Sequence, residues 1–178
     1  QGEVKLTGTI IDSLDKEQKL QIIFNFEPIN FHSRFTKDTN FTIILEEPEL
    51  ETITNTANNI TLGQKINLKT KLKNSSLVNF NNVKLNFVYP EEFNYLSAKP
   101  EPFEDNNEWI MMEVPAQSES SELKIEGSFP TTLTFQTEDD RYKEFTIQIQ
   151  LLGKDDQYYT VKEDKVSLQI IDQTLNTY

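Results

Sequence analysis

The chain has 178 residues, no cysteine and a formal net charge of −12. This length allows one or two domains. The acidic balance argues against nucleic-acid binding, because such a surface repels phosphates. The absence of cysteine excludes disulfides and thiol chemistry, and no apolar run reaches the ~18 residues that a membrane-spanning helix needs.

Apolar and polar residues alternate along most of the chain, which is the pattern of half-buried strands. No stretch keeps a 3.6-residue period over three turns, so helices are not expected. Turn residues separate the runs, and short strands at this spacing predict an all-β, antiparallel β-sandwich. In chain order, we expect strands at 4–6, 20–26, 41–45, 66–72, 83–89, 109–114, 123–125, 145–151 and 166–170.

Part of the sequence occurs twice. Residues 18–53 can be laid over residues 143–178 without a gap, and Val4–Gly8 matches Leu123–Gly127. The repeat unit is therefore about 125 residues long, which is the length of an independent domain and predicts a tandem array. The matched apolar residues are Leu20, Ile22, Phe24, Phe26, Phe41, Ile43, Leu45 and Leu50 with Phe145, Ile147, Ile149, Leu151, Val166, Leu168, Ile170 and Leu175.

The repeat predicts a domain boundary near Pro48, which cannot donate to a strand ladder. We expect residues 1–47 to be the C-terminal part of a preceding sandwich repeat and residues 48–178 to be one complete repeat. Because the chain begins at Gln1 without a signal peptide, we interpret it as a mature or excised fragment.

Residues 1–47 supply only about three strands, which would leave an apolar face uncovered. Three interpretations stay open. The missing strands can be absent from this fragment, the half-domain can pack on the complete domain, or another chain can supply the complement.

A second pattern lies between Leu62 and Ala98. It consists of Gly63-Gln64 before an alternating strand, then Leu72-Lys73-Asn74-Ser75-Ser76, then Asn82-Val83-Lys84-Leu85, and finally the run from Tyr89-Pro90 to Ser97-Ala98. It resembles a conserved repeat domain of unknown function of bacterial and archaeal surface proteins, similar to cell-adhesion-related bacterial domains and S-layer repeats.

The resemblance covers about residues 51–130, with 131–178 compatible. It implies an immunoglobulin-like sandwich, tandem arrays on cell-surface or secreted proteins, and no catalytic residues. The sequence departs from the family pattern at Asn74-Ser75-Ser76, where the family has Asn-x-Gly, and after Phe129, where the segment is longer.

Residues that could carry chemistry are few. His32 is the sole histidine, so a catalytic triad or a zinc site lacks partners, and we expect a solvated histidine and no enzyme. The acidic run Glu138, Asp139 and Asp140 is the candidate for a calcium site, because calcium takes several oxygen ligands from loops. The alternative is a solvated acidic loop, and no other cofactor is expected.

Four rings, Phe93, Tyr95, Phe103 and Trp109, are the candidate ligand-binding residues. A binding module would expose at least two of them on one surface, whereas Trp109 can instead fill the core. Three Asn-x-Ser/Thr sequons begin at Asn40, Asn59 and Asn74. Asn74 is the best candidate for glycosylation, because it lies in an expected turn.

These observations favour a non-catalytic structural or adhesive module of an extracellular or cell-surface protein. It would act as a rigid spacer in a stalk, fibre or surface layer, with neighbouring copies of the repeat as partners. The alternative is a module that binds a carbohydrate or a cell-surface protein through loops at one end of the sandwich. An enzyme is the weakest hypothesis, because a nucleophile, a base and an oxyanion donor do not occur together.

Overall fold

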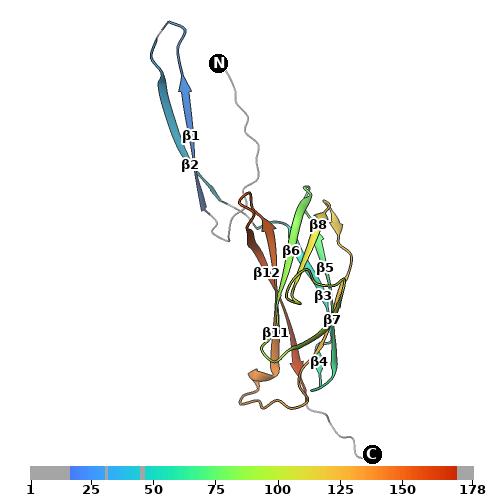
Figure 1. Ribbon diagram of the computed structural model, residues 1–178. Coiled ribbons are helices and arrows are strands. Elements are labelled where there is room, and N and C mark those ends of the chain that lie inside the picture. The colour runs from blue at the N-terminus through green and yellow to red at the C-terminus, as the bar shows by residue number, and fades with distance from the viewer. Residues whose placement is uncertain (1–16, 31, 45–46, 172–178) are drawn as a thin grey trace, which may run out of the picture. The chain divides into compact units, whose positions relative to one another are not determined.

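The computed structural model describes residues 17–30, 32–44 and 47–171 and divides into two units between Glu47 and Pro48. We call residues 17–44 the hairpin unit and residues 48–171 the sandwich unit; Figure 1 shows the strands of both. The expected strand at 4–6 lies outside the described residues. None of the described residues forms a helix that is long and apolar enough to cross a membrane.

The hairpin unit consists of β1 (Glu17–Phe26) and β2 (Phe35–Ile44), which pair antiparallel from Glu17↔Ile44 to Phe26↔Phe35. Residues directly opposite each other in such a pair lie on the same face. One face therefore carries a row of apolar side chains, and the other is mostly polar. The residues of this apolar face are Leu20, Ile22, Phe24, Phe26, Phe35, Phe41 and Ile43.

The sandwich unit contains two sheets. The first has the order β3-β5-β10-β7, with the short β9 also paired to β5, and the second has the order β4-β12-β11-β6-β8. The first sheet contains β3 (Leu50–Asn55), β5 (Lys65–Asn74), β7 (Asn94–Lys99), β9 (Ser118–Glu119) and β10 (Leu123–Ser128). The second contains β4 (Asn59–Ile60), β6 (Phe80–Val88), β8 (Glu108–Val114), β11 (Tyr142–Leu152) and β12 (Tyr158–Ile170).

The first strands of the sandwich unit pass from one sheet to the other. β3 pairs antiparallel with β5 in the first sheet. Three residues after β3 ends, the chain enters β4, which pairs parallel with β12 in the second sheet at Asn59↔Gln169 and Ile60↔Ile170. Since β3 and β4 run in the direction of β12, the chain enters this unit at one end and leaves it at the other (Figure 1).

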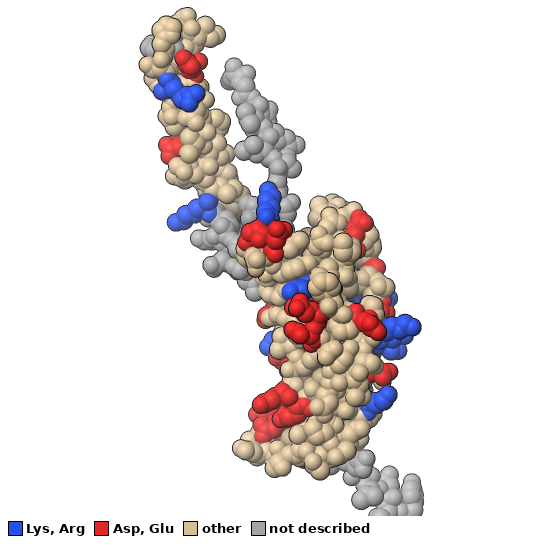
Figure 2. Space-filling view, in the orientation of Figure 1, with Lys and Arg blue, Asp and Glu red and all other residues tan. Residues whose placement is uncertain are grey.

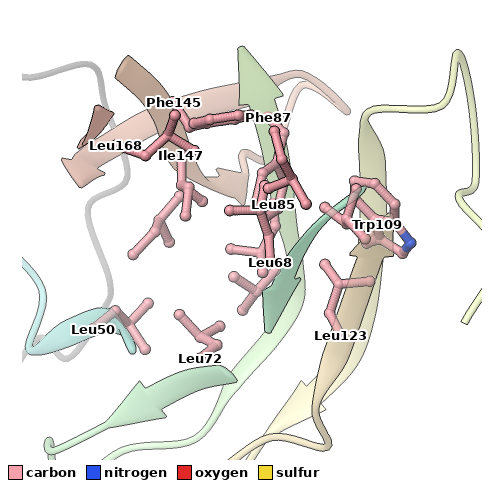
Figure 3. Packing of buried hydrophobic residues seen from close by; sticks show 14 of the residues in the cluster. Leu50, Leu68, Leu72, Leu85, Phe87, Trp109, Leu123, Phe145, Ile147 and Leu168 are labelled. Atoms are coloured by element: carbon pink, nitrogen blue, oxygen red, sulfur yellow. The ribbon is translucent and has the colours of Figure 1, made fainter. Parts of the chain in front are cut away.

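The core lies between the two sheets, where side chains are buried at every second position along most of β5, β6 and β11. Figure 3 shows Leu68 of β5 beside Leu85 of β6 and Leu72 of β5 beside Leu50 of β3, all within one buried cluster. Burial of each such side chain contributes roughly 1.5–3 kcal/mol. Twenty apolar residues form this cluster, which explains why a chain with a low apolar fraction still folds.

The predicted all-β sandwich is confirmed, and its strand pairs are antiparallel except for β4 with β12, which is parallel. Among the described residues, the only helical segment is a 3₁₀ turn, Asp139–Arg141. Four strands were missed by the sequence patterns, namely β3, β4, β7 and β9. β4 and β9 are two-residue strands, which are too short to show any periodicity.

Candidate functional site

Two of the four candidate rings, Phe103 and Trp109, line a hollow beside the link from β7 to β8. The hollow has a volume of about 530 Å³ and is lined by Pro100, Glu101, Pro102, Phe103, Trp109, Ile110, Met111, Glu113, Ser120, Ser121 and Leu123. The Trp109 side chain is 4% exposed, and its Nε1–H donates to the Pro100 carbonyl at 3.0 Å. The indole is therefore a core residue with a satisfied donor, while Phe103 is 70% exposed.

The other two rings, Phe93 and Tyr95, do not line this hollow and lie in an aromatic cluster that Phe87 joins to Trp109. Phe93 packs edge-on against Phe129 and Phe145 at centroid distances of 5.8 and 5.0 Å, and Tyr89 lies 5.0 Å from Phe93 and 6.4 Å from Tyr95. Burial raises the pKa of the Tyr89 phenol, and its hydroxyl donates to the Asn106 carbonyl. Of the four candidate rings only Phe103 is exposed, so the expectation of two exposed, convergent rings is not met.

The acidic candidates lie in the loop after Phe135. The Asp140 carboxylate accepts hydrogen bonds from the backbone N–H groups of Gln136 and Thr137, both at 2.8 Å, and these bonds lower its pKa. Glu138 instead faces Arg141, with Oε2 3.5 Å from Nε. Within residues 17–30, 32–44 and 47–171, no three acidic or histidine side chains converge enough to hold a metal ion. The calcium site stays a prediction.

The same loop borders a second hollow, of about 460 Å³. Lys143 lies there and forms an ion pair with Glu92 at 3.0 Å, which lowers the pKa of the Glu92 carboxyl. A cation-binding role for Asp139 and Asp140 would therefore have to coexist with a lysine in the same hollow.

Asn74 is not available for glycosylation in the folded chain. Its side chain is 1% exposed, and its Nδ2 donates to the carbonyls of Val78, Val114 and Pro115 at 2.8, 3.1 and 3.0 Å. The expectation that Asn74 is the best sequon is therefore wrong, because the last residue of β5 turns inward to tie two loops together. Asn40 and Asn59 are exposed. His32 is exposed as well, in the connection between β1 and β2.

The two hairpins β1–β2 and β11–β12 correspond to each other in strand register. In β1–β2, Leu20 lies opposite Phe41, and in β11–β12, Phe145 lies opposite Val166. Adding 125 to each residue number of the pairs from Gln18↔Ile43 to Phe24↔Lys37 gives the pairs from Lys143↔Leu168 to Ile149↔Lys162. The repeat in sequence is thus also a repeat in strand register, and a polar residue recurs at Lys37 and Lys162.

The two hairpins differ in what covers them. Phe145, Ile147 and Ile149 are all at most 1% exposed, because the first sheet lies across them. The equivalent face of β1–β2 is open: Phe24 and Phe26 are 47% and 51% exposed, and Phe41 is 41% exposed. In Figure 2, most of the visible surface of the hairpin unit carries neither acidic nor basic side chains.

No family model matches the chain, and no curated protein matches it. Among solved structures, a cohesin module of a family 33 glycoside hydrolase from Clostridium perfringens is similar over 69% of this chain and 97% of its own, with 10% identity and a TM-score of 0.40. A conjugative transposon lipoprotein from Bacteroides eggerthii is similar over 67% of this chain and 96% of its own, with 11% identity and a TM-score of 0.43.

A third similar structure is AvmM, which catalyses macrocyclization in alchivemycin A biosynthesis. The similarity covers 74% of this chain and 93% of that protein, with 10% identity and a TM-score of 0.49. The three structures therefore include a cohesin module, a lipoprotein and an enzyme, and resemblances this distant transfer none of these functions to the chain.

Proposed function

We propose that this chain is a non-catalytic structural or adhesive module of an extracellular or cell-surface protein, in which sandwich repeats follow one another as spacers. A calcium ion held by Glu138, Asp139 and Asp140 would stiffen their loop. The partners would be neighbouring copies of the same repeat and a cell-surface protein or carbohydrate reached by the array.

The observation that carries this proposal is the shared register of β1–β2 and β11–β12 at an offset of 125 residues. A hairpin that copies the last hairpin of the sandwich unit, and ends directly before that unit begins, is what the junction of two tandem repeats would contain. A single compact enzyme or binding domain gives no reason for such a copy.

The strand directions support a spacer. Because β3 and β4 run in the direction of β12, Pro48 and Ile171 belong to opposite ends of the sandwich unit. Units that are entered at one end and left at the other extend an array by their full length when they are joined. A domain with neighbouring termini would instead fold the array back on itself.

The outward faces of the sandwich support solubility in such an array. On β5 and its neighbours they carry lysines paired with glutamates, as in Lys65–Glu126, Lys71–Glu119 and Lys73–Glu51. Charged side chains on outward faces and at edges discourage sheets from pairing edge to edge. Figure 2 shows acidic and basic side chains interspersed over the visible face of the sandwich.

The proposal is tested with chains of one, two and three joined copies of residues 48–172. For a spacer, the maximum dimension measured by small-angle X-ray scattering increases by a constant step with each copy, and the thermal unfolding midpoint changes little. Copies that fail to fold when joined, or a maximum dimension that does not grow with copy number, would contradict the proposal.

A further inference from the structure

The inference concerns the apolar face of β1–β2 and rests on the proposed repeat architecture. We propose that this face packs against the strands of another β-sandwich repeat, equivalent to β3 through β10, which precede the hairpin in the same polypeptide. The hairpin unit would then be the closing element of a second sandwich.

The covered hairpin shows what such a face requires. On β11, Phe145, Ile147 and Ile149 are buried by the first sheet, and β6 pairs with the outer edge of the hairpin from Thr146↔Val88 to Leu151↔Val83. The same register places Leu20, Ile22 and Phe24 of β1 at these three positions. A β-sheet with an apolar face is therefore the occupant that fits.

The opposite face of the hairpin follows the same rule. Gln148 lies on the outward face of β11, where it accepts from Asn86 and donates to Glu163, and its equivalent on β1 is Ile23. Because Ile23 lies on the face that would point to solvent, its 54% exposure calls for no partner. Phe24 and Ile23 thus form a matched pair of test positions.

The order of strands along the chain indicates where the strands that cover this face come from. In the sandwich unit, β3 to β10 come before the hairpin that closes them. By the same offset, the strands that β1–β2 closes come before it in the polypeptide. The strands of the sandwich unit cannot cover the apolar face of β1–β2 in this way, because β11–β12 already takes the position next to β6.

The test supplies the missing strands from outside. A fragment of residues 48–141, which lacks β11–β12, is diluted from denaturant into a solution of the full chain of residues 1–178. We expect the fragment to stay soluble and to elute with the full chain as a one-to-one complex in light scattering. The chain of residues 48–178, which lacks the hairpin unit, is the control. It can keep the fragment soluble only by giving up its own β11–β12, so the amount of soluble fragment in its presence is the baseline.

Three variants of the full chain locate the contact. Phe24→Lys should reduce the soluble fragment to the baseline, while Ile23→Lys on the opposite face should leave it unchanged. Phe24→Ile, which introduces the residue found at the equivalent position Ile149, should keep the capture and so separates loss of the contact from loss of the hairpin fold.

Precipitation of the fragment despite the full chain would overturn the inference, as would equal losses for the two lysine variants. A full chain that is itself a dimer, and that becomes a monomer in Phe24→Lys, would show instead that a second copy covers the face. None of these results depends on whether joined copies of residues 48–172 extend, so the two proposals can fail separately.

Discussion

The carboxylate of Asp164 on β12 accepts two hydrogen bonds from Thr52 on β3, one from its backbone N–H at 2.6 Å and one from its hydroxyl at 2.8 Å. β3 belongs to the first sheet and β12 to the second, so this polar contact joins the two layers at one side of the sandwich. Asp164 lies on the same face of β12 as the buried Leu168, where an apolar residue would be the usual choice.

We therefore predict that Asp164→Ala lowers the free energy of unfolding by about 1–3 kcal/mol, because it leaves a partly buried N–H without its acceptor. Thr52→Val should cost less, about 1 kcal/mol, since the backbone bond is kept. Urea unfolding followed by the fluorescence of Trp109, the only tryptophan, measures both. Equal stability of all three chains would show that the contact contributes nothing.

Asn74 gives a second prediction. Its amide holds three carbonyls, and its Oδ1 accepts from the backbone N–H and the hydroxyl of Ser76. Asn74→Asp removes every donor and places an acid among the carbonyls, so the unfolding free energy should fall by at least ~2 kcal/mol. Ser75→Ala, next to it, serves as the control in the same urea titration.

The burial of Asn74 also predicts the pattern of glycosylation. When the chain is secreted from a host that has the N-glycosylating transferase, peptide mapping should find no glycan on Asn74. Asn40 and Asn59 are exposed and therefore accessible to the enzyme. A glycan on Asn74 would mean that modification precedes folding, and that the amide does not hold the loops as described.

Gly127 on β10 gives a prediction about packing. A Cβ at this position would meet the ring of Phe93 and would lie 2.8 Å from the Asn94 carbonyl oxygen. The β-bulge between Glu126 and Gly127 brings β7 this close. Gly127→Ala should therefore destabilise the sandwich by about 1–3 kcal/mol.

The pair of Gly127→Ala and Phe93→Leu identifies the cause. If the ring is the obstacle, the double variant loses less stability than the sum of the two single variants, as a double-mutant cycle measures. Additive losses would assign the cost to the contact with the backbone of Asn94 instead.

The loop that contains Asp140 should respond to acid. The folded-state pKa of Asp140 lies below its ordinary value because two N–H groups donate to the carboxylate. Such a group stabilises the fold above its unfolded pKa, and this contribution is lost as the pH falls through the folded pKa. The difference in unfolding free energy between the natural chain and Asp140→Asn should thus be constant near neutral pH. It should become smaller when the pH falls below the ordinary pKa of an aspartate side chain.

Urea midpoints of both chains between pH 7 and pH 3 measure this difference. Asp139→Asn, at the neighbouring exposed position, is the control for removal of a charge alone. A difference that stays constant down to pH 3 would mean that the backbone bonds to Asp140 do not form in solution.

The sequence was most informative where a strand alternates over many residues. β5, β6 and β11 have nine to eleven residues each, and their buried positions coincide with the apolar positions of the pattern except at Thr70 and Asn74 of β5. β7 was missed because only Tyr95 and Ala98 are partly buried, three residues apart, beside the bulge in β10. A bulge shifts the inward positions by one residue, so the period of two disappears.

Site residues were harder to predict because their roles depend on distant partners. The turn composition around Asn74 is visible in the sequence, but the carbonyls of Val114 and Pro115 that bury it lie 40 and 41 residues away. Trp109 similarly finds its acceptor across the link from β7 to β8. By contrast, the correspondence between the hairpins β1–β2 and β11–β12 could be recognised from the sequence, since it needs only the chain itself for comparison.

The parallel pairing of β4 with β12 has a mechanical consequence. Gln169 N–H donates to the Asn58 carbonyl and Ile171 N–H donates to the Ile60 carbonyl, both at 2.8 Å. When the unit is pulled by its two ends, these bonds lie across the direction of the force and are loaded together in shear, so they cannot be broken one after another. Short as it is, β4 would therefore act as a clamp that resists stretching of an array tethered at both ends.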